Sequence, residues 1–394
     1  MTAVATRPRP GGDLRLMGDG NASGPKASPR VRPARQNGVV PASAMTVNGR
    51  FYGQAVTGVQ RYGREVVDAL DPLLDERGLR AVLALPRHTS APATLRAFEA
   101  EPSRHLGGHA WEQWALAARG APLLNLCNTG PVLARRQVLC LHDINVLLEP
   151  GSYRAGFRVF YGLLQPLLAR RAAVLTSVSR FSADTIAARF GLPRDRVVVL
   201  PNGHEHALRW RPDPEVLRRW PGERPFVLLL GSRARHKNAG LLMRLAPALD
   251  ARGLDLVVAG GSAPIFAAEP DGPEPRNLHR LGAVSDGALA TLLSRALCLA
   301  FPSWTEGFGL PIVEAMALGC PVVASNRASM PEVCGTAALM APPDDPAAWL
   351  AALGALQDSA TLRTELSGRG AEQVRRFRWT ETARGYLDLL ERLA

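Results

Sequence analysis

The chain has 394 residues, of which 46% are hydrophobic and 21% charged, an ordinary composition for a globular protein. At about 150 residues per domain, this length predicts two domains. The formal net charge is +12, but no basic stretch interleaved with aromatic residues supports nucleic-acid binding. An anionic ligand such as a diphosphate, or an anionic membrane surface, fits the charge better. No apolar run reaches the roughly 20 residues of a transmembrane helix.

Residues 1–44 carry seven Arg or Lys against two Asp, so +5 of the +12 lies there. This segment is rich in Pro, Gly and Ser without apolar periodicity, which predicts a disordered basic tail. It has no apolar core of a secretory signal. Met45 opens the first folded pattern, so Met1 and Met45 both stay open as translation starts. The five cysteines have no CxxC spacing and predict buried, reduced thiols in a cytoplasmic protein.

Strands alternate with helices through the first half of the chain, which predicts a parallel, doubly wound α/β sheet in a domain spanning 45–207. The expected strands are 44–47, 79–85, 123–126, 137–141, 174–178 and 197–200. The expected helices are 59–70, 111–118, 157–173 and 179–190.

After a polar, proline-bearing linker at 210–224, the pattern restarts with a buried strand at 226–230 (FVLLL). This restart predicts a second Rossmann-like domain, 208–376. Its expected strands are 226–230, 254–259, 296–301 and 321–324, and its expected helices are 239–250, 285–296 and 310–318.

The most informative stretch runs from Glu306 to Glu314 (EGFGLPIVE). A buried strand precedes it, and a helix begins inside it. Such a unit places a helix N-terminus at the carboxyl edge of a parallel sheet, where free N–H groups and the helix dipole favour phosphate. Two carboxylates at this point indicate a ligand that also presents hydroxyl groups, as a nucleotide-sugar does. The alternative is an ordinary capped helix, because the dipole alone favours glutamate in a first turn.

The E-x7-E spacing in EGFGLPIVEA, followed by EAMALGCPVVAS, resembles the retaining glycosyltransferases of family 4, group 1. The resemblance spans Thr46 to the chain end. It implies the GT-B fold, two Rossmann-like domains facing across a cleft, with helix 377–394 crossing back to the first domain. It further implies that Glu314 binds the donor ribose and that Glu306 lies against the donor sugar as a catalytic residue. Backbone groups between them are expected to contact the sugar and diphosphate: Gly307, Phe308, Gly309 and Leu310.

The loop GSRARHKN, which ends at Asn238, follows the first strand of the second half. Asn238 is a good N-cap, so Lys237 is expected beside a helix N-terminus, where a cation can neutralise a diphosphate. The family has a similar string whose lysine binds the donor phosphates, with an arginine a few residues earlier. The resemblance thus implies a catalytic, donor-binding Lys237, with Arg233 and Arg235 both open as the arginine. A solvated basic loop is the alternative.

His142 and Asp143 close a strand of the first half, also at the carboxyl edge. A lone histidine is more often structural. However, VLCLHDINVLLEP resembles the family's HD segment, in which the histidine faces the donor sugar. This implies a catalytic His142, while Asp143 either orients it or binds the acceptor.

Three further residues carry weaker expectations. Gly58 lets the backbone approach the donor at a helix start. Val284 lies in GAVSD, which in the family contacts the nucleobase through backbone atoms, although a simple helix N-cap explains the string equally well. Trp111 begins WEQ, which with NGRF at 48–51 matches a bacterial subgroup resembling mannosyltransferases of polysaccharide assembly. Trp111 is expected either to bind the acceptor or to pack.

The sequence has no DxD loop, HExxH or Cys/His set, so no metal and no cofactor are expected. The resemblance implies transfer of a hexose with retention, by front-face attack in which the leaving phosphate accepts the acceptor's proton. The subgroup favours GDP-mannose as donor. The acceptor is expected to be a polyprenyl-diphosphate-linked oligosaccharide or a polysaccharide end, in exopolysaccharide or O-antigen assembly. A nucleotide-sugar epimerase on a GT-B scaffold and a non-catalytic glycosyltransferase-like subunit stay open.

The expected helix 157–173 combines apolar residues with arginines at 154, 158, 170 and 171. One interpretation is a core helix of the first domain. The other is a helix that lies on anionic lipid, which predicts a cytoplasmic protein in peripheral contact with the inner face of the plasma membrane.

Overall fold

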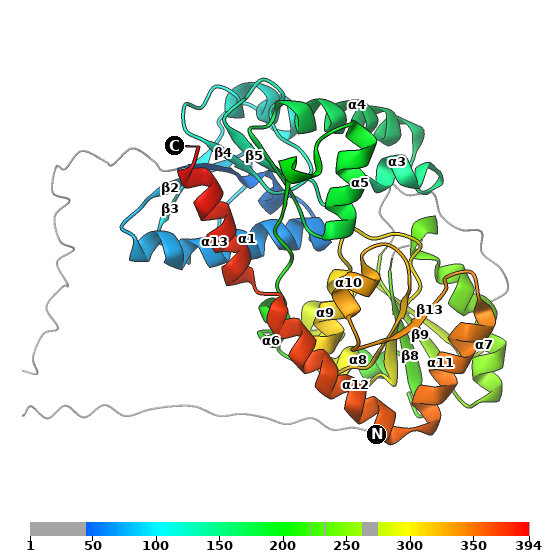
Figure 1. Cartoon of the computed structure of the whole chain (residues 1–394). Helices are drawn as coiled ribbons and strands as arrows, with labels where there is room; N and C mark the ends of the chain where they lie inside the picture. Colours follow the sequence, from blue (N-terminus) through cyan, green and yellow to red (C-terminus); the bar gives the residue numbers. More distant parts are fainter. Residues whose placement is uncertain (1–44, 221, 232–233, 262–274, 394) are drawn as a thin grey trace, which may run out of the picture. The chain divides into compact units, whose positions relative to one another are not determined.

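The computed structural model describes residues 45–220, 222–231, 234–261 and 275–393 (Figure 1). The tail predicted to be disordered lies outside the described residues. Two parallel sheets organise the described chain, and helices cover both faces of each sheet.

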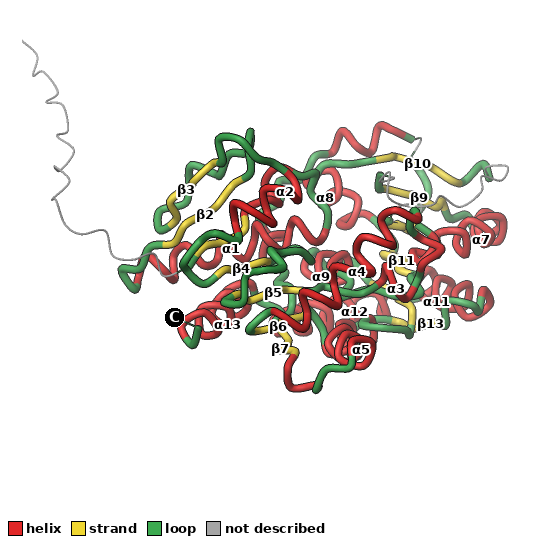
Figure 2. Tube along the Cα trace, turned by 90° about the horizontal axis from the view of Figure 1, so that it is seen from above, coloured by secondary structure: helices red, strands yellow, loops and turns green. Residues whose placement is uncertain are grey.

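The first sheet has seven parallel strands in the order β3-β2-β1-β4-β5-β6-β7 (Figure 2). The strand order reverses between β1 and β4, which makes the carboxyl edge there a natural binding position. The strands are β1 (Thr46–Asn48), β2 (Ala81–Leu85), β3 (Phe98–Pro102), β4 (Leu123–Asn125), β5 (Gln137–Cys140), β6 (Val174–Ser177) and β7 (Val197–Val199).

The second sheet has six parallel strands in the order β10-β9-β8-β11-β12-β13, so its order reverses between β8 and β11. The strands are β8 (Phe226–Leu230), β9 (Asp255–Ala259), β10 (Leu278–Gly282), β11 (Cys298–Phe301), β12 (Val322–Ser325) and β13 (Leu339–Ala341). The two sheets confirm the predicted α/β class with two doubly wound halves.

Helices of varied length connect these strands, and three further α-helices of the described chain follow the last strand. They are α1 (Gly58–Glu76), α2 (Gly108–Trp111), α3 (Asn145–Leu148), α4 (Ala155–Arg171), α5 (Arg180–Phe190), α6 (Glu205–Leu208), α7 (Ala239–Ala251), α8 (Asp286–Arg295), α9 (Leu310–Ala317), α10 (Met330–Cys334), α11 (Pro346–Asp358), α12 (Ala360–Gln373) and α13 (Trp379–Glu391). Among the described helices, none is both long enough and apolar enough to cross a bilayer.

Alternation along each strand determines which helices it contacts. In β8, Val227 and Leu229 point to one face and pack in a cluster with α7 and α11, whereas Phe226 and Leu228 point to the other face, toward α8 and α9. Both faces are apolar because a parallel sheet is covered by helices on either side. This arrangement leaves the carboxyl ends of the strands as the place for polar function.

The last helix returns to the first half of the chain. In Figure 1, α13 lies along α1, and the hydroxyls of Tyr62 and Tyr386 are 2.8 Å apart between them. The crossing back that the resemblance implied is therefore present. The limits of the two domains, 45–207 and 208–376, remain predictions.

Candidate active site

The loop that follows β11 holds Glu306 next to a cation. The Nζ of Lys237 lies 2.6 Å from Oε1 of Glu306, and the Ser303 hydroxyl donates to the same oxygen at 2.7 Å. The Glu306 side chain is largely buried, with 9% of the residue exposed. Burial strengthens such a pair, because little water screens the two charges. The structure thus brings together two site residues that are 69 positions apart.

Gly307 brings this loop against the first half of the chain. A Cβ at Gly307 would lie 2.5 Å from the His142 carbonyl oxygen, so only glycine fits here. The hydroxyls of Ser179 and Ser182, at the start of α5, donate to the Gly307 carbonyl at 2.6 and 3.0 Å. Gly309 has a φ of +98° and leads into α9. The loop is therefore fixed from both sides.

The side chain of Glu314 is buried in α9 and bonded across the chain. Nε2 of His206 lies 2.9 Å from its Oε1, and Nε of Arg61 lies 3.9 Å from the same oxygen. Phe308 and Leu310, on the way from Glu306 to Glu314, are buried. Glu314 thus has a fixed position, which an ordinary surface glutamate in a first helical turn would not have.

In the loop between β8 and α7, Lys237 points to Glu306, whereas Arg235 is exposed. Lys237 ends a short 3₁₀ turn that starts at Arg235, which is exposed beside Gly151. Arg233 lies outside the described residues. Asn238 precedes α7 with a φ of +54°, but its side chain does not cap that helix. It donates instead to the carbonyls of Pro302 and Pro343, so the expected cap is wrong and Asn238 holds two neighbouring loops together.

His142 and Asp143 follow β5 and contact Gly307 through their main chain and Cβ. The His142 ring is buried: Nε2 donates to the Leu126 carbonyl at 2.8 Å, and the ring meets Tyr62 edge-on. The His142 ring is therefore bonded and packed within the first half of the chain. This position favours a structural role over the predicted catalytic one. Burial raises the pKa of Asp143, and the nearby Glu306 carboxylate adds to this effect.

A cavity of about 420 Å³ opens between α1 and the start of α8. Its lining includes Val284, Arg61 and Asp286. The Arg61 guanidinium donates to both carboxylate oxygens of Asp286, at 2.5 and 3.1 Å. Gly58, the first residue of α1, is exposed, and a Cβ added to it would have open space around it to 4 Å. Val284 and Gly58 thus both lie at accessible positions, as a contact with a ligand requires.

Trp111 occupies a core position. It is 3% exposed and packs with Val82, Leu116 and Leu123. Of the two roles expected from sequence, this position favours packing over acceptor binding.

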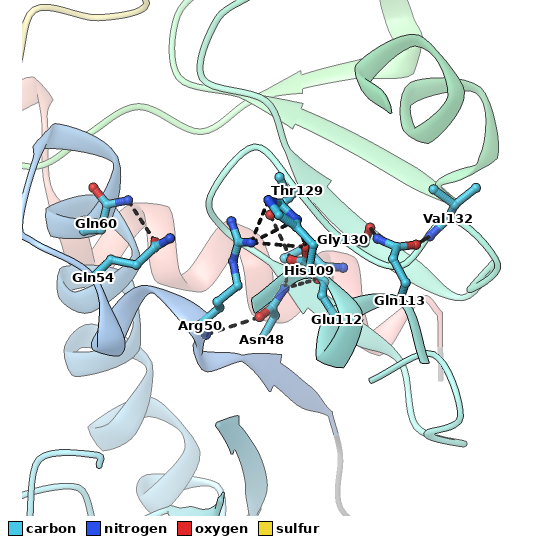
Figure 3. A network of polar contacts seen from close by, with 11 residues as sticks. Asn48, Arg50, Gln54, Gln60, His109, Glu112, Gln113, Thr129, Gly130 and Val132 are labelled. Carbon is cyan, nitrogen blue, oxygen red and sulfur yellow. Dashed lines mark hydrogen bonds and ion pairs between the residues drawn. The ribbon is translucent and has the colours of Figure 1, made fainter. Parts of the chain in front are cut away.

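The next residue, Glu112, is the centre of a buried polar network at the carboxyl edge of the first sheet (Figure 3). Its Oε1 accepts from Asn48 at 2.7 Å and from Thr129 at 2.8 Å, and its Oε2 lies near His109 and Arg50. Burial raises the pKa of Glu112, but these donors outweigh it and hold the pKa below its ordinary value. The donors around Glu112 balance the charge of its buried carboxylate. The strings NGRF and WEQ therefore stabilise the fold of the first half through one shared network.

The described residues contain no group of three or more His, Cys, Asp or Glu placed to hold a metal ion.

Comparison with known proteins agrees with this geometry. Residues 224–359 match the model for "Glycosyl transferases group 1". The chain is 34% identical over 278 residues to the O-antigen chain mannosyltransferase B of Escherichia coli, covering 65% of this chain and 71% of that protein. The chain belongs to the group 1 glycosyltransferases of family 4. Members of this family are retaining hexosyltransferases, so the chain is an enzyme of that class.

The chain is also similar to a second O-antigen mannosyltransferase in sequence and to a solved structure in fold. The O-antigen chain mannosyltransferase RfbU of Salmonella typhimurium is 26% identical, over 56% of this chain and 61% of its own length. The structure of Anabaena Alr3699/HepE in complex with UDP and glucose superposes with a TM-score of 0.65 at 17% identity, covering 88% of this chain and 98% of that one. At that identity it shows the fold alone, which is the GT-B glycosyltransferase fold predicted from sequence.

Two polar residues of this glycosyltransferase escaped the sequence interpretation. His206 follows the turn Pro201-Asn202-Gly203 in the crossing between the halves, where a lone histidine carries no recognisable signal. Arg61 stands in TGVQRY, directly after the glycine at 58, but nothing in that string indicates a partner on α8 or α9.

Proposed function

We propose that this glycosyltransferase moves mannose from GDP-mannose to a glycan acceptor, with retention of configuration, in O-antigen or exopolysaccharide assembly. The observation that carries the proposal is the joint placement of Lys237, Glu306 and Gly307 against the His142–Asp143 end of β5. The names of two relatives, both O-antigen chain mannosyltransferases, support the choice of sugar and pathway class.

The proposed donor site uses both halves of the E-x7-E string. Glu314 binds the ribose hydroxyls and Glu306 a sugar hydroxyl, while Lys237 neutralises the diphosphate. Main-chain N–H groups of 307–310 lie at the start of α9, where they favour an anion. Arg235 and Arg233 are both candidates for the arginine that binds the diphosphate. Val284 and Gly58 are proposed to border the nucleoside.

The proposed chemistry is electrostatic stabilisation of the leaving diphosphate. As the sugar–phosphate bond breaks, negative charge grows on the phosphate oxygens, and a preorganised ammonium group stabilises it. The acceptor hydroxyl bonds to the anomeric carbon on the same face, and its proton passes to the leaving phosphate. We propose that Asp143, whose pKa the nearby Glu306 carboxylate helps to raise, binds the acceptor hydroxyl, and that the buried His142 ring holds this segment in place.

The acceptor we propose is a polyprenyl-diphosphate-linked oligosaccharide, with a polysaccharide end as the second choice. Such an acceptor requires contact with a membrane, and α4 offers a surface for it. α4 buries Leu164, Leu168 and Ala169 in the core but exposes Val159 and Leu163. It is therefore a core helix on one side and an apolar surface on the other.

The exposed apolar side of α4 continues onto neighbouring segments. Its members are 42–72% exposed: Val159, Phe160, Leu163 and Leu167 on α4, with Trp114 and Leu133 beside them. The segments are joined, because Arg171 donates to the Val132 carbonyl and the Gln113 side chain accepts from the Val132 N–H. No acidic residue occurs between Glu149 and Asp184, a stretch with five arginines. An exposed apolar patch in an arginine-rich stretch without acidic residues fits the cytoplasmic face of an anionic bilayer.

A donor screen tests the proposed function. Thermal shift is measured with GDP-mannose, UDP-glucose, ADP-glucose and dTDP-glucose, and GDP-mannose is expected to raise the melting temperature most. A larger shift with UDP-glucose would contradict the choice of donor, and no shift with any of the four would contradict the donor site. Conversion of the donor without any acceptor would identify an epimerase instead.

A further inference from the structure

Within the described residues, the chain crosses between its two sheets twice, and the two crossing segments are bonded to each other. Nδ1–H of His204, after β7, donates to the Phe377 carbonyl at 2.7 Å. The N–H of Trp379, at the start of α13, donates to the Glu205 carboxylate at 3.1 Å. A Cβ at Gly203 would lie 2.3 Å from the Trp379 nitrogen, so the backbones are in direct contact. The crossings therefore form one joined element.

A chain of two hydrogen bonds leads from this joined element to Glu314. Nε1–H of Trp379 donates to Nδ1 of His206 at 3.0 Å, and Nε2 of His206 lies 2.9 Å from Oε1 of Glu314. An indole N–H can only donate, so Nδ1 must accept. The proton of the imidazole is then on Nε2, which donates it to the carboxylate. The two partners fix the tautomer without reference to any hydrogen position.

All three side chains are withdrawn from water. Trp379, His206 and Glu314 are 3%, 1% and 5% exposed. The bond to His206 takes Oε1 of Glu314, and Arg61 approaches the same oxygen. Among the described residues, none donates a hydrogen bond to Oε2 of Glu314. This second oxygen can therefore accept from a ligand. A carboxylate held in this way loses little rotamer freedom when a ligand binds.

We propose that His206 and Trp379 are positioning residues: they orient Glu314 for two ligand hydroxyls and link it to both crossings between the halves of the enzyme. This inference rests on the proposed role of Glu314 at the donor ribose. It goes further, because it makes nucleotide affinity depend on two residues of the crossing segments, His206 and Trp379, that hold Glu314 in place. Neither residue touches the reacting atoms, so the effect is expected in binding and not in the chemical step.

The test compares nucleotide affinity and turnover in the full-length enzyme. Calorimetry with GDP and with UDP gives Kd, and transfer at saturating donor gives kcat. In His206→Ala, Kd for the nucleotide that wild type binds is expected to rise about tenfold, while kcat changes less than about twofold. Trp379→Phe removes the donor to Nδ1 and is expected to raise Kd about threefold. His206→Gln can still accept from the indole and donate to the carboxylate, so it is expected to recover most of the affinity.

His204→Ala is the matched control. It breaks a bond between the same two crossings but has no contact with Glu314, so it is expected to lower the melting temperature without changing Kd. Unchanged Kd in His206→Ala, an equal rise in His204→Ala, or a His206→Gln variant as weak as His206→Ala would each overturn the inference. Binding of neither nucleotide by wild type would instead contradict the proposed function.

A measurement without any ligand separates failure of this inference from failure of the proposed function. In ¹⁵N-histidine-labelled enzyme, His206 is expected to show a protonated Nε2 and an unprotonated Nδ1, and this signal is expected to disappear in His206→Gln. In Trp379→Phe, Nδ1 loses its indole donor, so the Nδ1 signal is expected to shift while Nε2, which faces the carboxylate, stays protonated. A His206 signal with the proton on Nδ1 would overturn the inference even in an enzyme that binds no nucleotide.

Discussion

The ammonium group of Lys237 lies 2.6 Å from a carboxylate oxygen of Glu306, although β9, β10 and β11 separate the two residues in the chain. Each group thus neutralises the other before any donor arrives. A nucleotide-sugar offers a diphosphate to the cation and a hydroxyl to the carboxylate, so it can replace this ion pair with two separate interactions. In the proposed function, the pair marks the point where diphosphate and sugar meet.

Loss of either partner of this ion pair is expected to impair transfer strongly. In Lys237→Ala the leaving diphosphate loses its cation, and the transfer rate is expected to fall about 10²–10³-fold. Glu306→Gln is expected to lower the rate at least tenfold, because it keeps the shape but not the charge. The measurement is kcat at saturating donor. Glu365→Gln, on the exposed face of α12, is the control, and equal effects in Glu365→Gln and Glu306→Gln would contradict the role of Glu306.

Gly307→Ala tests the contact between the donor loop and β5. The added methyl group would meet the His142 carbonyl at 2.5 Å, and a backbone atom cannot move away cheaply. We expect a loss of about 1–3 kcal/mol in the free energy of unfolding, together with a loss of transfer. Gly368→Ala, in α12 with open space around it, is expected to stabilise by about 0.5–1 kcal/mol. Urea unfolding measures both, and the same sign for both substitutions would contradict the packing argument.

His236, beside Lys237, is expected to make stability depend on pH. Burial lowers its pKa to about 4, and Lys237 adds to this effect. The unfolded chain, with an ordinary pKa of about 6.5, binds the proton first as the pH falls. The folded state therefore loses stability between about pH 6.5 and pH 4, by about 3 kcal/mol at most.

His236→Gln removes this titration, so its melting temperature is expected to fall less than that of wild type between pH 7 and pH 4.5. His105→Gln, at an exposed position, is expected to follow the wild-type profile. Parallel profiles for wild type and His236→Gln would show that His236 does not carry the dependence.

The exposed apolar side of α4 is expected to bind anionic vesicles. Leu163→Glu/Leu167→Glu is expected to weaken sedimentation with phosphatidylglycerol vesicles at least about tenfold, because two leucines that would be buried in the bilayer become charged. Arg154→Gln/Arg158→Gln is expected to lower the salt-sensitive part of the binding. Leu208→Glu, at an exposed leucine on α6, is the control. The basic tail is common to all variants, so equal binding by all of them would assign the membrane contact to the tail.

The same α4 variant distinguishes a protein partner. If Leu163→Glu/Leu167→Glu changed the oligomeric state in size-exclusion chromatography while vesicle binding stayed as in wild type, the patch would be an interface between copies of the chain and not a membrane contact.

The central strands could be predicted from sequence, as could the edge strand β7, but the other three edge strands could not. FVLLL in β8 and CLAF in β11 are apolar on both faces, which gives a continuous signal. The strands that escaped prediction all lie at sheet edges: β3 (FEAEP), β10 (LHRLG) and β13 (LMA). An edge strand is half exposed, so it is short or polar and resembles a loop. α12 escaped for a similar reason, since it buries only Leu366 and Gly370.

The candidate site, too, could be predicted from sequence only in part. Glu306, Gly307 and Glu314 share one loop and helix, so their spacing alone carries the prediction. His206 reaches Glu314 over 108 positions, through the packing of a crossing segment that has no motif. The string LHD located His142 at the correct edge, but the direction of its ring depends on the Leu126 carbonyl and Tyr62, which the string does not contain.

The proposed reaction of this site is the transfer of mannose with retention of configuration. Its direct test is incubation of the enzyme with GDP-mannose and a polyprenyl-diphosphate-linked oligosaccharide, followed by NMR of the anomeric signal in the isolated product. The expected product is a mannosylated lipid with the anomeric configuration of the donor, formed at least about 100-fold more slowly by Lys237→Ala. A product of inverted configuration, or equal rates for wild type and Lys237→Ala, would contradict this proposal.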